Sequence, residues 1–168
     1  MKITSTQRNS KDCIICGMEN QLGLKAPFYN LEDGSVATVV TFKNHHQSYP
    51  DRTHGGMVGA LLDELMGRAL WVVEPETFGV TTTLEITYRR PVPLDTKVKA
   101  RAEITFHSPR GLTAKGAVYS MDGKLLVQGK GKYFKVPFEK AFSENSSYHT
   151  EMCYEIPLDI TEIDFPEL

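Results

Sequence analysis

The sequence lacks any hydrophobic run long enough to cross a membrane. A membrane-spanning helix needs about 18 or more consecutive apolar residues, and no stretch of this 168-residue chain reaches that length. The first residues, MKITSTQRNSKD, contain no apolar core of the kind that a secretory signal requires. We therefore expect a soluble, cytoplasmic protein that has no membrane partner.

The chain also has few cysteines and little net charge. Its three cysteines, an odd number, fit a reducing compartment better than a disulfide framework. A formal charge of −2 gives no reason to expect nucleic acid as a partner. No repeat or low-complexity segment interrupts the chain, and its 40% hydrophobic content predicts one domain with a proper core.

Two of the cysteines form the sequence Cys13-Ile-Ile-Cys16-Gly17, which looks like half of a zinc site. A structural zinc normally takes four ligands, and the third cysteine, Cys153, lies far away in the sequence without a neighbouring cysteine. We therefore predict that this segment packs as a loop and that the protein uses no metal and no other cofactor.

The segment 54–73, HGGMVGALLDELMGRALWVV, is apolar on nearly all sides of a helical wheel. Such a helix must be buried. Glu64 and Arg68 stand one turn apart in the favourable acid-before-base order, which predicts an ion pair. This long helix is the element around which the rest of the chain is expected to be arranged.

Asp63 in the same segment has no comparable partner. Gly59 and Gly67, one turn away on either side, leave room for a second subunit or a substrate to approach the carboxylate. A place on an ordinary solvent-facing stripe is the alternative, but the neighbours on the wheel are the apolar residues Ala60, Met66 and Leu70. An unpaired carboxylate is costly to bury, so Asp63 is a candidate functional residue.

Alternating apolar and polar residues predict strands on both sides of this helix. One strand is expected before the helix at 34–42, and four are expected after it at 78–88, 96–106, 112–120 and 124–136. Short turns join the last three, as in an antiparallel meander. The predicted fold class is α+β, an antiparallel five-stranded sheet wrapped around one long helix.

These patterns divide the chain into three parts. Residues 1–12 are polar and are expected to be flexible, and residues 13–136 should form the folded domain. Residues 137–168 are rich in acidic side chains. We expect them to form an acidic C-terminal extension that lies on the surface or on a partner subunit.

Two stretches of this sequence point to a family. HGGMVGALLDE, with Asp63 nine residues after His54, and TTTLEITYRRPV together resemble the hotdog-fold acyl-CoA thioesterases of the phenylacetate-pathway and hydroxybenzoyl-CoA type. The resemblance covers roughly residues 13–136. It implies hydrolysis of an acyl-CoA thioester to free acid and CoA by a homodimer or a dimer of dimers (homotetramer), with active sites at the subunit interface.

The resemblance also implies roles for individual residues. Asp63 would act as general base toward water or as nucleophile, and Thr81, unless it is simply an exposed strand threonine, would help to hold the attacking water. His54 would fix the turn at the start of the helix. Unsatisfied N–H groups and the helix dipole suit that turn to an oxyanion, and the donors would be those of Gly55, Gly56 and Met57.

The sequence leaves open which residues bind the substrate. Some relatives carry an asparagine six residues before the His of His-Gly-Gly, where this chain has Ser48 with Gln47 beside it, so either side chain could complete the oxyanion site. Met57 is expected to influence the length of the acyl pocket. Coenzyme A phosphates need nearby cations. Candidates, each of which could also be an ordinary solvated charge, are Arg89, Arg90, Lys97, Lys99, Arg101 and Arg110.

Two other functions fit the same pattern. A hotdog dehydratase or hydratase would use a histidine and an acid, and the loop residues His45 and His46 keep this alternative open, although the His-Phe-Pro signature of such dehydratases is absent. A non-catalytic acyl-CoA-binding module is the third class. Sensors of that kind carry a DNA-binding domain, for which the segment before Cys13 is too short.

Overall fold

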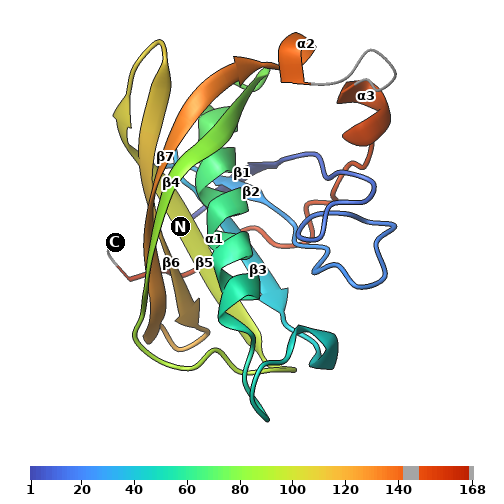
Figure 1. Ribbon diagram of the computed structural model, residues 1–168, viewed down its shortest axis with the longest axis vertical. Coiled ribbons are helices and arrows are strands. Elements are labelled where there is room, and N and C mark those ends of the chain that lie inside the picture. Colours follow the sequence, from blue (N-terminus) through green and yellow to red (C-terminus); the bar gives the residue numbers. More distant parts are fainter. Residues whose placement is uncertain (142–147, 167–168) are drawn as a thin grey trace.

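The computed structural model describes residues 1–141 and 148–166 (Figure 1). A seven-stranded antiparallel sheet, in the order β1-β2-β3-β5-β6-β7-β4, curves around one long helix, α1 (Gly55–Arg68). The predicted fold class is confirmed. The predicted strand number is wrong, because the sheet has seven strands rather than five.

Five of the strands follow the alternation of the sequence. They are β3 (Val36–Thr41), β4 (Thr77–Tyr88), β5 (Lys97–His107), β6 (Gly111–Ser120) and β7 (Leu125–Pro137). β5, β6 and β7 form the predicted meander. β4 pairs with β7 rather than with its neighbour in sequence, and so forms one edge of the sheet.

The two additional strands are β1 (Ile3–Thr6) and β2 (Tyr29–Leu31). β1 pairs with β2, and β2 pairs with β3. The expectation that residues 1–12 are flexible is therefore wrong for β1. Strands of four and three residues are too short to display a clear alternation, which explains why the sequence did not reveal them.

α1 packs against the sheet through buried apolar side chains, so the predicted burial of this helix is confirmed. Its buried residues include Val58, Leu61, Leu62, Leu65 and Met66. Two glycines of the sheet allow this close approach, because a Cβ at Gly116 or Gly129 would lie 3.1 or 3.4 Å from Met66. A short 3-10 helix, η2 (Ala69–Val72), continues α1.

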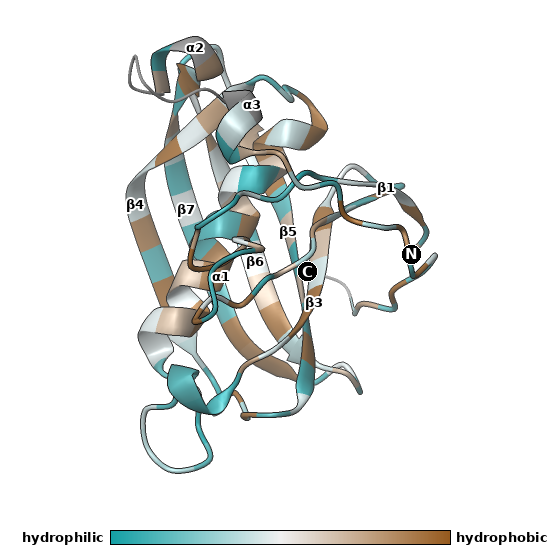
Figure 2. Ribbon diagram, turned by 90° about the vertical axis from the view of Figure 1, so that its right-hand side faces the viewer, coloured by the Kyte–Doolittle hydropathy of each residue, from teal (hydrophilic) through white to brown (hydrophobic). Residues whose placement is uncertain are grey.

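The irregular segment between β1 and β2, residues 7–28, covers the side of α1 that faces away from the sheet (Figure 1). We call it the covering segment. Ile15, Cys16 and Phe28 of this segment share one hydrophobic core with the helix. The loop before α1 contains a second 3-10 helix, η1 (Asn44–His46), and is mostly hydrophilic (Figure 2). Within the described residues, no helix combines the length and the apolar character needed to span a membrane.

The described part of the C-terminal extension packs on its own chain. After the short helices α2 (Phe138–Ala141) and α3 (Tyr148–Glu151), it runs past β1, where the backbone N–H of Ile3 donates to Thr161 O at 2.8 Å. Ile163 joins Ile3 in a second, smaller core. Residues 142–147 and 167–168 of the predicted acidic extension lie outside the described residues.

Candidate active site

Asp63 lies in the middle of α1, half-buried, in the wall of a cavity of about 360 Å³. Its Oδ1 accepts hydrogen bonds from the hydroxyl of Thr81 at 2.8 Å and from the hydroxyl of Tyr133 at 3.2 Å. The structure thus brings Asp63 and Thr81 together. Asp63 has no charged partner among these contacts, as the sequence indicated, and two neutral hydroxyl groups orient its carboxylate.

Tyr133 is the residue of this group that sequence reasoning missed. It pairs with Thr81 across β7 and β4, so both side chains reach Asp63 from adjacent strands. Burial, followed by the negative charge of Asp63, raises the pKa of Tyr133 and keeps its hydroxyl protonated. Gly131 makes room for the ring, because a Cβ there would lie 2.5 Å from it.

The two glycines that flank Asp63 on α1 face side chains of the sheet. A Cβ at Gly67 would lie 3.6 Å from the ring of Tyr133, and a Cβ at Gly59 would lie 3.6 Å from the hydroxyl of Tyr88. The space that was expected to admit a second subunit or a substrate is therefore bordered by β4 and β7 of the same chain.

At the N-terminus of α1, His54 is the capping residue. Its Nδ1 accepts the N–H of Gly56 at 2.9 Å, and its carbonyl oxygen accepts the N–H of Met57 at 3.0 Å. The hydroxyl of Tyr88 donates to the carbonyl oxygen of Gly55 at 2.6 Å. Two of the three predicted oxyanion donors therefore already have partners in this turn.

This turn borders a second cavity, of about 440 Å³, whose lining includes Ser48, Gly55, Arg89 and Arg90. Gln47 is exposed in the same loop. Asp63 follows Gly55 by about two helical turns, a separation of roughly 12 Å along the axis. One chain thus gathers the predicted residues into two separate groups, one around Asp63 and one around the helix N-terminus.

The predicted coenzyme A cations are also divided. Arg89 and Arg90 are exposed beside the helix N-terminus. Arg110 lies in the β5–β6 turn, at the opposite end of the sheet (Figure 1), so the three arginines do not share one cavity. Arg101 is buried and pairs with Asp33 and Glu103. The two remaining candidates are lysines: Lys99 is buried, and Lys97 is exposed at the start of β5.

The predicted ion pair is confirmed: Arg68 Nε lies 2.8 Å from Glu64 Oε1. The Arg68 side chain is only 3% exposed. Its guanidinium lies 4.2 Å from the ring centre of Phe28 and 4.5 Å from that of Trp71. Glu64 therefore partners a buried cation rather than a surface one.

The Cys13–Cys16 segment forms part of the wall of the Asp63 cavity. Cys16 is buried, Cys13 is half-buried, and Cys153 is exposed. A hydrogen bond from the Cys16 thiol lowers the pKa of Cys13 to about 6. The same hydrogen bond, together with burial, raises the pKa of Cys16.

Comparison with known proteins shows similarity to thioesterases. Residues 52–127, which contain His54, Asp63 and Thr81, match the thioesterase superfamily. Mouse acyl-coenzyme A thioesterase THEM4 is 27% identical to this chain over 124 residues, which are 73% of this chain and 53% of the mouse protein. The chain spans about half the length of the curated relatives it matches.

Solved structures of related proteins share the fold. A crystal structure of a thioesterase superfamily protein, 29% identical, has a TM-score of 0.68 and covers 73% of this chain and 63% of its own. A Bacillus halodurans protein crystallised with CoA is 26% identical, with a TM-score of 0.58, and covers 65% and 72% of the two chains.

Proposed function

We propose that this chain hydrolyses an acyl-CoA thioester to free acid and CoA. The observation that carries the proposal is the half-buried carboxylate of Asp63, oriented by Thr81 and Tyr133 in the wall of a cavity. Three similarities support the choice of substrate: the match of residues 52–127 to the thioesterase superfamily, the acyl-CoA thioesterase activity named for a relative, and the CoA bound to another similar protein.

In this proposal Asp63 acts as general base toward water, or as nucleophile, at the thioester carbonyl. Attack at the carbonyl carbon places negative charge on its oxygen, and the carbon–sulfur bond then breaks to release CoA as the thiolate. The N-terminus of α1 stabilises the oxyanion through its dipole and its N–H groups. Since Gly56 N–H is bonded to His54, substrate would share or displace that bond at Gly56.

The dehydratase alternative loses one of its two loop histidines, His46. This side chain is buried, and both of its ring nitrogens are engaged: Nδ1 accepts the N–H of Lys43 at 3.0 Å, and Nε2 lies 2.9 Å from Leu22 O. His46 therefore holds the loop together and is not available for proton transfer to a substrate. The cytoplasmic location stays a prediction from the sequence.

We also propose that the active species is a homodimer, or a dimer of dimers, in which each site combines Asp63 of one subunit with the helix N-terminus of the other. The separation of the two groups within one chain supports this arrangement. β4 offers a surface for it, because this edge strand carries the exposed side chains Val80 and Leu84. Exposed edge strands readily pair with another chain.

The test is release of free thiol from a panel of acyl-CoA esters. We expect turnover by the wild-type protein, and a decrease of at least about 100-fold for Asp63→Asn, the scale of losing a general base. Glu76→Gln, in an exposed turn after the helix, is the control and should retain activity. A folded Asp63→Asn variant with near-normal turnover, or a wild-type protein inactive on the whole panel, would refute the proposal.

A further inference from the structure

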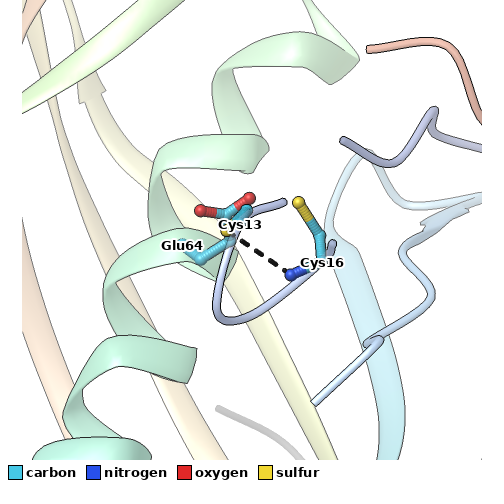
Figure 3. Close-up of side chains that lie close together, drawn as sticks. All are labelled: Cys13, Cys16 and Glu64. Atoms are coloured by element: carbon cyan, nitrogen blue, oxygen red, sulfur yellow. Dashed lines mark hydrogen bonds between the residues drawn. The ribbon is translucent and has the colours of Figure 1, made fainter. Parts of the chain in front are cut away.

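Cys13, Cys16 and Glu64 form a cluster of potential metal ligands outside the group that orients Asp63. One ligand atom from each residue lies within 4.8 Å of the others. The two cysteines come from the segment that covers α1, and Glu64 comes from α1 itself (Figure 3). We propose that these three side chains bind one zinc ion, with a water molecule as the fourth ligand.

The cysteine loop is already shaped for a metal. Cys13 Sγ accepts the backbone N–H of Ile15 at 3.3 Å and that of Cys16 at 3.5 Å. Such converging N–H groups stabilise an anion, here a metal-bound thiolate. Gly17 closes the turn by donating its N–H to Cys13 O at 2.8 Å, and a Cβ at this position would lie 2.3 Å from that oxygen. Two cysteines separated by two residues are a common zinc-binding pair.

Glu64 supplies the ligand that the sequence analysis did not find. Its Oε1 accepts a hydrogen bond from Arg68 Nε, so the carboxylate is held in place before any metal arrives. Arg68 is fixed in turn, because it also donates to the carbonyl oxygen of Arg8 at 2.9 Å. Carboxylates that bind metals are generally hydrogen-bonded in this way.

The charges of the cluster balance when a divalent ion is present. Two thiolates and the Glu64 carboxylate are offset by one dication together with the guanidinium of Arg68. Buried charges are costly unless they are compensated, so this balance matters for Arg68 and Cys16, which are 3% and 1% exposed. Thiolate ligands favour zinc over the hard cations magnesium and calcium.

The site has room for a fourth ligand. Cys13, Cys16 and Glu64 all line the cavity of about 360 Å³ that also contains Asp63. Zinc with three protein ligands commonly completes its tetrahedral coordination with water. The proposed ion would tie the covering segment to α1. The zinc site is independent of the proposed thioester hydrolysis, which is assigned to Asp63 and the helix N-terminus.

Cobalt provides a direct readout of the site. Reduced protein is titrated with Co²⁺, and then with Zn²⁺, while the absorption spectrum is recorded. We expect one equivalent of Co²⁺ to produce thiolate-to-cobalt charge-transfer bands and the visible bands of a tetrahedral site, and Zn²⁺ to abolish them. Thermal unfolding with and without Zn²⁺ should show stabilisation, because a metal that binds only the folded state raises the melting temperature.

Variants assign the ligands. Cys13→Ser and Cys16→Ser should lose the charge-transfer bands. Glu64→Gln should weaken zinc binding by at least about 10-fold, because even the loss of a group that only supports a metal ligand has an effect of that size. Cys153→Ser is the matched control, because Cys153 is exposed and outside the cluster, and it should bind metal as wild type does. Circular dichroism shows whether each variant is folded.

Two results would overturn the inference. The first is a reduced, folded wild-type protein that gives no thiolate-to-cobalt bands. The second is metal binding that survives Cys13→Ser or Glu64→Gln unchanged, which would place the metal elsewhere. Thioesterase activity is not used as a readout, so failure of the zinc site and failure of the proposed hydrolysis can be told apart.

Discussion

The hydroxyl of Thr81 lies 2.8 Å from Asp63 Oδ1, although 18 residues separate the two in sequence. The helix supplies the acid and the edge strand supplies the hydroxyl group. The position of the carboxylate therefore depends on how β4 packs beside α1, and a change in β4 should be felt at Asp63.

Thr81→Val removes the hydroxyl and keeps the shape of the side chain. We expect kcat/KM for acyl-CoA hydrolysis to fall by about 5- to 10-fold, the effect of losing one hydrogen bond of roughly 1 kcal/mol. Thr81→Ser keeps the donor and should restore most of the rate. Equal rates for the valine and serine variants would mean that the hydroxyl does not position Asp63 or its water.

Mixing two inactive variants tests whether the sites are shared. Asp63→Asn removes the acid, and Gly56→Val disturbs the helix N-terminus because a Cβ at this position would meet the ring of His54 at 2.9 Å. A dimer with one subunit of each kind contains one site that carries neither change, so the mixture should regain activity after subunit exchange. Each variant alone should stay inactive.

Sedimentation of the same samples supplies the control for that experiment. We expect at least a dimer at the assay concentration. An active monomer, or verified mixed dimers without recovered activity, would contradict a site assembled from two subunits.

Glu64→Gln should destabilise the fold more than the loss of a surface ion pair does. The variant leaves the buried guanidinium of Arg68 without its anion, and we expect a decrease of about 2 kcal/mol in the free energy of unfolding. Asp95→Asn is the comparison, because its partner Lys43 is 55% exposed. An exposed pair contributes about 0–1 kcal/mol. Urea unfolding of the metal-free proteins measures both, and equal small losses would show that Arg68 does not need Glu64.

His46 should make stability depend on pH. Burial, and to a lesser extent the nearby His45, lowers the pKa of His46 below its ordinary value of 6.5. Between that value and the lower pKa of the folded state, only the unfolded chain takes up the proton, so stability present above pH 6.5 is lost as the pH falls. Urea unfolding between about pH 8 and pH 5 should show a steeper loss for wild type than for His46→Asn. Identical slopes would exclude His46 as the cause.

The sequence predicted those elements whose residues carry a repeating pattern. The helix around Leu61 and the strands around Val80 and Val98 are long enough for burial to impose a period. β1 has no such period, because its place depends on β2 and on the distant Ile163. A short strand fixed by remote partners leaves little local trace in a sequence.

The same distinction applies to the site. Asp63 and Thr81 were found through a motif, whereas Tyr133 reaches Asp63 only because β7 lies beside β4 in the sheet. That neighbourhood follows from the strand order and not from any local pattern. Glu64 was assigned to Arg68 alone, because its distance from Cys13 appears only after the covering segment has folded onto α1.

The two ends of the described fold meet. The amino group of Met1 donates to the carbonyl oxygen of Ile163 at 2.9 Å, across a separation of 162 residues. Contacts of such long range form only after the intervening chain has been ordered, because the entropy of closing the loop must be met first. β1 is therefore the first element of this fold to be synthesised, and its surroundings are among the last to be completed. Tyr29 and Leu31 of β2 can pack against Ile3 early, but until Ile163 arrives this small core stays incomplete and open to the chaperones and proteases that survey a nascent chain.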